Sequence, residues 1–531
     1  MKTSYRILTL ALAGLAFASC VDLNTEPYGS TVTSEQKEQV IADNPERVGA
    51  GVNGIAALFS VYQNANPGYT RHNDFGYGAV MLFMDTRGTD LIGDDTGYNW
   101  FSYGLDMITD RTSSSLITEN IWNTMYHQIF AANALAGSLS ADTDDSTQQF
   151  YLAQAYAVRA FDYFVLAQLY QFTYKGHESA PCVPIITDKN SEQVAIDGGL
   201  ARATVQQVYD QILSDIDTAV DLLGKSSEVR SDKRYVDLAT ALGIRARVKL
   251  VMQDWSGAGA DAQAAIAASS STPISWDEAA KPGFQKMTEK NWMWGIAIAE
   301  TDRVVTSGIV NWHSHMGSLN YGYASVGAWR YVSHSLYDQI QSSDARKGWF
   351  LDANGVSENL TAEQQDYVKS KSIPPYTQVK FAPYKDELYT STNANDIVLM
   401  RIEEMYLIAA EAKIMSGDIA GGVADLNSFV TTYRDPDYAC YATTAKAAQN
   451  AVWLQRRIEF WGEGLSYFDI MRRGEGYDRR GAGFASKFVF VLSGDDPIFI
   501  FELPESEIQA NAFISESDNN PAATTPSPVS E

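Results

Sequence analysis

The chain is poor in cysteine and in basic residues, and both shortages exclude classes of function. Of its three cysteines, Cys182 and Cys440 show neither a Cys-x-x-Cys spacing nor histidines at the spacing of a zinc site. The 40 Lys and Arg residues are outnumbered by 65 Asp and Glu, so the net charge is −25. Nucleic-acid phosphates require a basic surface, which excludes nucleic acid as a partner. Whether Cys182 and Cys440 form a disulfide is left undecided by the sequence.

A long hydrophobic run is also missing. The apolar stretch 7–17 has about eleven residues, roughly half of what a bilayer-spanning helix needs. Two basic residues precede it and Ala18-Ser19 follow it, which is the order of a secretory signal. Cys20 directly after these small residues predicts cleavage and lipid attachment at its thiol, although Phe17 stands where a lipobox usually has Leu. An ordinary secretory signal with an incidental cysteine is the alternative.

The strongest periodic pattern is helical. Residues 204–223 place apolar side chains at three- and four-residue steps and begin with a capping box, Thr204 with Gln207. Residues 151–170 are apolar almost all round, but Arg159 and other polar residues inside them predict a helix buried in protein, not in a bilayer. Further helices are expected at 118–138, 236–253, 258–268, 401–416, 420–431 and 448–472.

Several of these helices form pairs joined by short turns, at Ser256-Gly257 and at Ser416-Gly417. A helix, a glycine turn and an Ala-rich helix are typical of tetratricopeptide repeats, but their period of roughly 34 residues is absent. The predicted fold is therefore mostly α, a degenerate tetratricopeptide-like array of helical pairs with long irregular loops and a few short strands. The irregular regions are 66–117 and 271–394, a hairpin is expected within 488–508, and the tail 521–531 is expected to be disordered.

Acidic and histidine motifs favour structural roles. Glu459 and Glu463 lie four residues apart on one helix among arginines, whereas the carboxylates of a glycosidase flank the substrate, so we expect ion pairs. The same interpretation applies to Glu403, Glu404 and Glu411.

Neither a metal nor a cofactor is predicted. His313 and His315 would face the same side of a strand but have no evident third ligand. The acidic stretch 142–146 lacks the Glu and Gly of an EF-hand and is expected to cap the next helix.

Two loops rich in aromatic residues, 96–104 and 311–334, remain as candidate binding segments. A sugar presents apolar C–H faces and hydroxyl groups, so its site needs flat rings beside polar donors and acceptors. The candidate ligand-binding residues are Asp90, Tyr98, Asn99, Trp100, Tyr103, Trp312, Tyr323, Trp329, Arg330 and Tyr331.

Conspicuous motifs follow one another along the chain. They include "GTDLIG", "WNTMYHQIFAANAL", "LMRIEEMYLIAAEAK" and, most specific, "RRIEFWGEGLSYFDIMRRG" at 456–474. In this order they resemble the SusD/RagB family of outer-membrane nutrient-binding lipoproteins. Gln455 and Ser466 depart from the family's usual Glu and Arg, at positions we expect to be structural.

The resemblance implies a SusD-like fold, a lipid anchor at Cys20, and a place on the extracellular face of the outer membrane. It also implies an oligosaccharide ligand, a SusC-like TonB-dependent transporter as partner, and a binding protein, not an enzyme. The expected divisions are a signal peptide (1–19), a tether (20–48), a helical half with an aromatic loop (49–270), a loop-rich ligand-binding region (271–394) and a second helical half with the hairpin and tail (395–531).

Three alternatives stay open. In the first alternative, the ligand is a peptide or a glycopeptide. In another, the protein is a surface glycosidase that uses Asp90 with Asp94 or Asp95. In the third, it is a scaffold that binds only its transporter.

Overall fold

The computed structural model describes residues 46–62, 72–93, 100–308 and 310–530. The chain divides into two units, residues 1–49 and 50–531. Apart from the first turn of α3, every element named here lies in the second unit.

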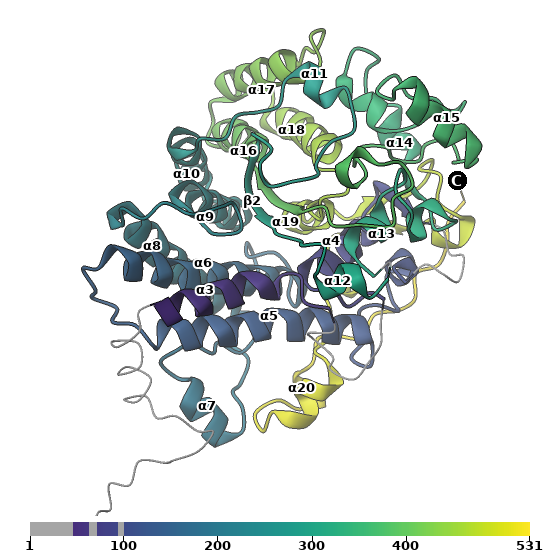
Figure 1. The fold of residues 1–531 in the computed structure, drawn as a ribbon. Helices are drawn as coiled ribbons and strands as arrows, with labels where there is room; N and C mark the ends of the chain where they lie inside the picture. Colours follow the sequence, from purple (N-terminus) through teal and green to yellow (C-terminus); the bar gives the residue numbers. More distant parts are fainter. Residues whose placement is uncertain (1–45, 63–71, 94–99, 309, 531) are drawn as a thin grey trace, which may run out of the picture. The chain divides into compact units, whose positions relative to one another are not determined.

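The structure is mostly helical (Figure 1). Its α-helices are α3 (Glu46–Leu58), α4 (Tyr77–Arg87), α5 (Leu116–Ala136), α6 (Ser146–Leu169), α7 (Ser191–Asp197), α8 (Val205–Lys225), α9 (Leu238–Met252), α10 (Trp255–Ala268), α11 (Trp276–Ala279), α12 (Arg303–Thr306), α13 (Trp312–Met316), α14 (His334–Tyr337), α15 (Ala362–Ser370), α16 (Ile402–Met415), α17 (Ile419–Tyr433), α18 (Ala445–Glu459), α19 (Ser466–Arg473) and α20 (Glu505–Ala510). Short 3-10 helices are η1 (Ser102–Asp106), η2 (Tyr323–Ser325), η3 (Ala345–Trp349), η4 (Tyr384–Asp386), η5 (Ser486–Phe488), η6 (Pro497–Phe499) and η7 (Glu516–Asp518). The strands are β1 (Leu91–Gly93), β2 (Trp292–Ile296), β3 (Arg330–Val332), β4 (Ile397–Arg401), β5 (Tyr477–Asp478) and β6 (Val491–Leu492).

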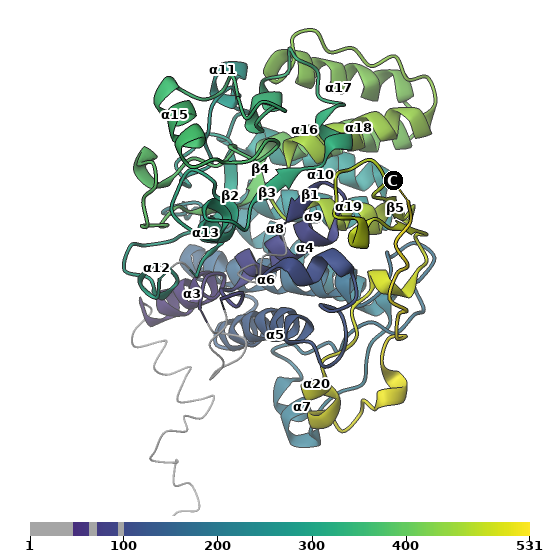
Figure 2. The same ribbon diagram turned by 90° about the vertical axis from the view of Figure 1, so that its right-hand side faces the viewer.

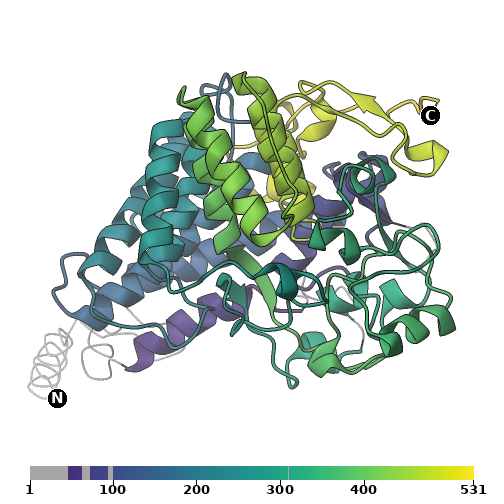
Figure 3. The same cartoon turned by 90° about the horizontal axis from the view of Figure 1, so that it is seen from above.

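Long helices pack in sequence order into an array. α5 lies against α6, α6 against α8, α8 against α9, α9 against α10, α10 against α16, and α16 against both α17 and α18. Figure 3 shows these helices side by side, from blue through teal to green. The array of helical pairs confirms the predicted fold class.

Local sequence explains where the helices of the array form. The α8 capping box is present, since Gln207 N–H donates to the Thr204 hydroxyl at 3.2 Å and the Gln207 side chain accepts from Thr204 N–H at 2.9 Å. Its apolar positions, such as Val208, Ile212 and Ile216, are buried, as the periodicity predicts. Full burial of such a side chain contributes about 1.5–3 kcal/mol.

The polar residues inside α6 bind neighbouring helices. Arg159 donates to both oxygens of Asp215 on α8, at 2.8 and 2.7 Å. This bidentate pair confirms that the apolar helix is buried within the array. Across the described residues, none of the helices combines the length and apolarity that crossing a bilayer requires.

The prediction of one helix over 448–472 is wrong. α18 ends at Glu459, and α19 begins only at Ser466. Gly462 and Gly464 between them adopt φ of 76° and 75°, in the left-handed region that glycine tolerates. A Cβ on Gly464 would lie 2.7 Å from Met81 Cβ, so close packing against α4 requires glycine here.

Two further boundaries differ from the sequence prediction. The region 66–117 contains α4, every residue of which is buried. The turn before α10 lies at Gln253-Asp254, because Gln253 adopts φ 61° and the Asp254 side chain accepts from Gly257 N–H at 3.0 Å. Ser256 and Gly257 therefore belong to the helix.

The strands form three two-stranded antiparallel sheets, β1–β3, β2–β4 and β5–β6. Figure 2 shows β1 to β4 near the middle of the view. The predicted hairpin within 488–508 is wrong, since Val491–Leu492 pair with Tyr477–Asp478 and the segment after them forms η6.

The tail makes hydrogen bonds to the rest of the chain, and the question of a Cys182–Cys440 disulfide, left open by the sequence, is answered in this structure. Residues 521–530 have no regular secondary structure, but Val529 N–H donates to Val489 O at 2.9 Å and Arg111 donates to Pro521 O at 2.9 Å. Cys182 and Cys440 are both free thiols. Cys20 lies outside the described residues.

Candidate functional site

The first aromatic loop is held by one buried ring. Phe101 is fully buried, with its ring centroid 4.6 Å from that of Phe83 on α4. This anchor brings its neighbours Trp100, which is half-buried, and Tyr103, which is 41% exposed, to the surface. Asn73 donates from its amide to Trp100 O at 3.2 Å and fixes the backbone of the same turn.

His72 joins the first aromatic loop to the second. Its ring stacks on Trp100 with centroids 5.3 Å apart and an interplanar angle of 19°. Its Nδ1 hydrogen-bonds to the Tyr323 hydroxyl at 2.7 Å. Burial lowers the pKa of His72, which favours the neutral ring in this position. The structure therefore brings Trp100, Tyr103 and Tyr323 into one region.

A hollow of about 530 Å³ lies beside Trp100 and Tyr103. Its far wall is the turn that leads into α5, held by Asp106, whose carboxylate accepts from the N–H groups of Ile108 and Thr109 at 2.9 Å each. The hollow is lined by Asn73, Trp100, Tyr103, Ile108, Thr109, Thr112, Ser114, Ser115, Leu116 and Ile117. Its volume falls in the range of small-molecule sites.

The lining has the chemistry of a site for an uncharged polyol. It combines two flat rings with an amide and several hydroxyls, and among the described residues that line it none is charged. Hydroxyls and amides both donate and accept hydrogen bonds, as sugar hydroxyl groups do. The hollow suits a neutral saccharide better than a charged one.

Asp90 is not at this site. It is buried, receives hydrogen bonds from Arg457 at 3.0 Å and from the Ser466 hydroxyl at 3.2 Å, and its carbonyl accepts from Trp461 Nε1 at 2.8 Å. The Asp90 carboxylate joins β1 to the 456–474 segment, so its position gives no support to the predicted ligand contact. Asp94 and Asp95, its partners in the glycosidase alternative, lie outside the described residues, as do Tyr98 and Asn99.

Two candidates of the second aromatic segment are inside the protein. Trp312 is buried, with its ring at a right angle to Phe381 and centroids 4.7 Å apart. Arg330 is fully buried, and its Nε donates to His315 O at 2.8 Å. Both side chains are covered by protein, so their positions give no support to the predicted ligand contacts.

The remaining two candidates lie apart from the hollow. Trp329 is half-buried against the apolar cluster that contains Leu319 and Leu351. Tyr331 is half-buried on β3 and lines a separate hollow of about 400 Å³ with His334 and Tyr376. Of the candidate residues in the second segment, Tyr323 alone lies beside the first segment among the residues that the structure describes. His315 of the second segment, which is not a candidate, also packs on Phe101, with ring centroids 4.8 Å apart.

The acidic residues of the C-terminal helices form buried ion pairs, as predicted. Glu459 binds Arg346, Arg401 and Arg434, and Glu463 binds Arg401 and Lys380. Burial lowers the pKa of Lys380 to about 8, against the effect of Glu463. These carboxylates hold segments together.

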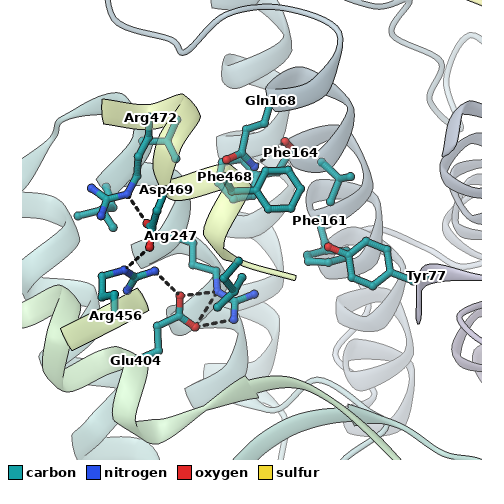
Figure 4. Close-up of a pocket in the computed structure, with 14 residues that line it drawn as sticks. Tyr77, Phe161, Phe164, Gln168, Arg247, Glu404, Arg456, Phe468, Asp469 and Arg472 are labelled. Atoms are coloured by element: carbon teal, nitrogen blue, oxygen red, sulfur yellow. Dashed lines mark hydrogen bonds and ion pairs between the residues drawn. The ribbon is translucent and has the colours of Figure 1, made fainter. Parts of the chain in front are cut away.

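A second chain of ion pairs lies beside a small pocket of about 40 Å³ (Figure 4). Arg472 and Arg456 both bind Asp469, at 2.6 and 2.7 Å, and Glu404 binds Arg456 and Arg247. Glu411 binds Arg472 in the same way, so the glutamates of α16 are structural. Gln455, where the family usually has Glu, is uncharged, but its side-chain oxygen accepts a hydrogen bond from Arg346.

His313 and His315 lie on the short helix α13, not on a strand. Both are buried, burial lowers the pKa of His313 to about 3, and His315 Nε2 hydrogen-bonds to His72 O at 3.1 Å. The described part of the chain holds no group of three metal-ligating side chains. In the acidic stretch 142–146, Asp145 accepts from Gln148 N–H at 2.8 Å and caps α6, as predicted.

Sequence reasoning missed His72, Asn73 and the hydroxyl-bearing run 109–115. The run was visible as "TDRTSSS" directly before a helical pattern, where Ser and Thr are expected as caps. His72 and Asn73 gave no signal, because only folding places them beside Trp100.

Comparison with known proteins identifies the family. Residues 87–250 match the family described as "Starch-binding associating with outer membrane", and residues 321–490 match the SusD family, so the two matches span more than half of the chain. The chain is 23% identical to SusD-like protein P2 of Formosa agariphila over 89% of this chain and 90% of the relative.

Solved structures of similar fold agree. A SusD-like carbohydrate binding protein of Bacteroides vulgatus superposes with a TM-score of 0.71 at 22% identity, over 89% of this chain and 97% of the other. Surface glycan-binding protein A of Bacteroides thetaiotaomicron, solved in complex with laminarihexaose, gives 0.63 at 17% identity, over 88% and 98%. With the helical array and the ordered motifs, these matches establish that the chain belongs to the SusD/RagB family.

Proposed function

We propose that this protein is a cell-surface lipoprotein that binds an uncharged oligosaccharide and delivers it to a SusC-like TonB-dependent transporter. The hollow beside Trp100 and Tyr103 is the observation that carries the proposal, because it sets two aromatic rings beside uncharged polar side chains. The His72 ring, which is hydrogen-bonded to Tyr323, supports the Trp100 ring from behind this wall. The family description and the laminarihexaose complex of a structural neighbour support a glycan as the ligand.

Capture would use the ring faces first. A sugar ring stacks on Trp100 or Tyr103, while its hydroxyls bond to Asn73, Thr109 and Thr112. Stacking of a flat ligand on one aromatic side chain contributes about 1–3 kcal/mol where it has been measured by truncation. Tyr323 does not line the hollow and acts through His72, which holds the Trp100 ring in place.

Calorimetric titration of the full chain in detergent tests this site. Neutral hexasaccharides (laminarihexaose, cellohexaose, maltohexaose) and short peptides form the panel. Trp100→Ala is expected to weaken saccharide binding about tenfold or more. Tyr441→Ala, which removes an 87% exposed ring elsewhere, is the matched control and should leave binding unchanged.

Each outcome decides something. Saccharide binding that is lost in Trp100→Ala but kept in Tyr441→Ala supports the proposal. Binding of peptides without saccharides would favour the peptide-uptake alternative. Saccharide binding that is unaffected by Trp100→Ala would remove the site from this hollow.

The anchor and the delivery role need separate tests, since Cys20 lies outside the described residues. Mass spectrometry of the mature N-terminal peptide should find acyl chains on Cys20, and Cys20→Ser should release the protein from the membrane. Crosslinking in isolated outer membranes should capture a TonB-dependent barrel. Recovery of the protein without any barrel would contradict the delivery role.

A further inference from the structure

A hollow of about 610 Å³ lies in the 271–394 region and shares no lining residue with the Trp100 hollow. Its walls come from α11, from η3 and from the turn 352–359 (α11 is labelled in Figures 1 and 2). The lining residues are Trp276, Asp277, Ala280, Tyr337, Ser342, Asp344, Ala345, Lys347, Gly348, Phe350, Asp352, Val356, Ser357, Glu358 and Asn359. The volume is ample for one or two sugar units.

Trp276 offers this hollow a fixed and open ring. The side chain is 41% exposed, although tryptophan is usually well covered in folded proteins. Its Nε1–H donates to Ser343 O at 3.1 Å, and the capping box of Ser275 with Glu278 fixes the helix that carries it. The indole is therefore held in one orientation before any ligand arrives, which lowers the entropic cost of stacking.

The opposite wall is also preformed. Asp352 accepts from Val356 N–H at 2.9 Å, and Asp352 N–H donates to Val356 O at 2.8 Å, which closes the turn. Asn359 donates from its amide to Ala345 O at 2.9 Å and joins this turn to η3. Both sides of the hollow are thus tied to neighbouring backbone.

Polar groups in the hollow are available to a ligand. Asp277 and Glu358 make no hydrogen bond or ion pair with any residue that the structure describes, in contrast to Asp344, which binds Arg346. Lys347 Nζ donates to Ile340 O at 2.6 Å and has further hydrogens to donate. Carboxylates accept hydrogen bonds from sugar hydroxyls, and their excess here repels uronate or sulfate groups.

We propose that this hollow is a second saccharide-binding site, which takes an uncharged oligosaccharide with one ring on the Trp276 indole. Asp277 and Glu358 accept hydrogen bonds from the hydroxyls of that ring, and Lys347 donates one. The site works independently of the Trp100 hollow, because the two share no lining residue.

Fluorine NMR of the full chain labelled with fluorinated tryptophan tests the site directly. Trp276→Phe and Trp100→Phe identify the two resonances among the 11 tryptophans. Millimolar laminarihexaose, cellohexaose or maltohexaose should shift the Trp276 resonance, and should still do so in Trp100→Ala. A hexamer of galacturonate should shift it less than any neutral probe that binds.

Asp277→Asn provides a variant that leaves the fold untouched, since Asp277 has no partner among the described residues to lose. Asp277→Asn should lower the saccharide affinity measured from the shift of the Trp276 resonance several-fold, whereas Tyr441→Ala should leave that affinity unchanged. A Trp276 resonance that no neutral hexasaccharide moves overturns the second site. If the Trp100 resonance moves at the same time, the proposed function stands without it. If Trp276 alone responds, the second site stands and the Trp100 hollow is excluded.

Discussion

Replacing Glu459 with Gln should destabilise the protein strongly, because it removes one charge from a balanced buried cluster. Glu459 is fully buried and accepts four hydrogen bonds from guanidinium groups, at distances from 2.7 to 3.0 Å. The cluster contains four cations and four carboxylates: Arg346, Lys380, Arg401 and Arg434 with Asp344, Glu403, Glu459 and Glu463.

The magnitude follows from this balance. Gln fills the same volume but leaves one positive charge uncompensated, and its amide N–H groups point at guanidinium donors. Breaking a buried ion pair by removing one partner costs about 3–5 kcal/mol. Burial acts to raise the pKa of Glu459, but the neighbouring arginines hold that pKa well below its usual value, so the carboxylate is charged at neutral pH.

Urea unfolding at neutral pH, followed by far-ultraviolet circular dichroism, measures the loss. Asp221→Asn is the matched control, since its pair with Lys225 is exposed on both sides and such pairs contribute at most about 1 kcal/mol. If Glu459→Gln and Asp221→Asn lost equal stability, the assignment of Glu459 to a charge-balanced core would be refuted.

Three further changes test other features by the same unfolding measurement. Gly464→Ala should lower the free energy of unfolding by at least about 2 kcal/mol, because the left-handed backbone is strained and the new Cβ collides with Met81. Gly474→Ala, with φ 62° and open space around it, should lower it less. Equal losses would exclude the collision. Burial raises the pKa of Asp162 well above its usual value, and neither of its carboxylate oxygens has a hydrogen-bond partner among the described residues. The folded state therefore loses stability as pH rises above the unfolded-state pKa of about 4. Asp162→Asn should remove that loss, so its advantage over the native protein should grow as pH rises above about 4. Burial acts to raise the pKa of Asp469, but its two arginine partners hold that pKa at about 2. The stabilisation from Asp469 is therefore complete above about pH 4 and disappears as pH falls toward 2. Asp469→Asn should reduce this loss of unfolding free energy at acid pH, and an unchanged dependence on pH would contradict the ion pairs.

The helices of the array were predictable because their signals are local. A capping box and a three- and four-residue period define α8 without any knowledge of its neighbours. α4 escaped the same reasoning because it is buried on every side and therefore lacks a polar face that would give it a period. The break before α19 also escaped, since it follows from the close approach of Gly464 to Met81, far away in the sequence.

The candidate site divides in the same way. The residue types were predictable, since Trp100, Tyr103 and Tyr323 stood out as loop aromatics, but Trp312 looked equivalent and is buried. The family resemblance, the helical pairs and the acidic net charge could be predicted from the residues alone, because they depend on composition and on short-range order. Which rings reach solvent, and the link that His72 makes between the two aromatic loops, became visible only in the folded chain, because the exposure of a ring depends on what packs against it from distant parts of the sequence.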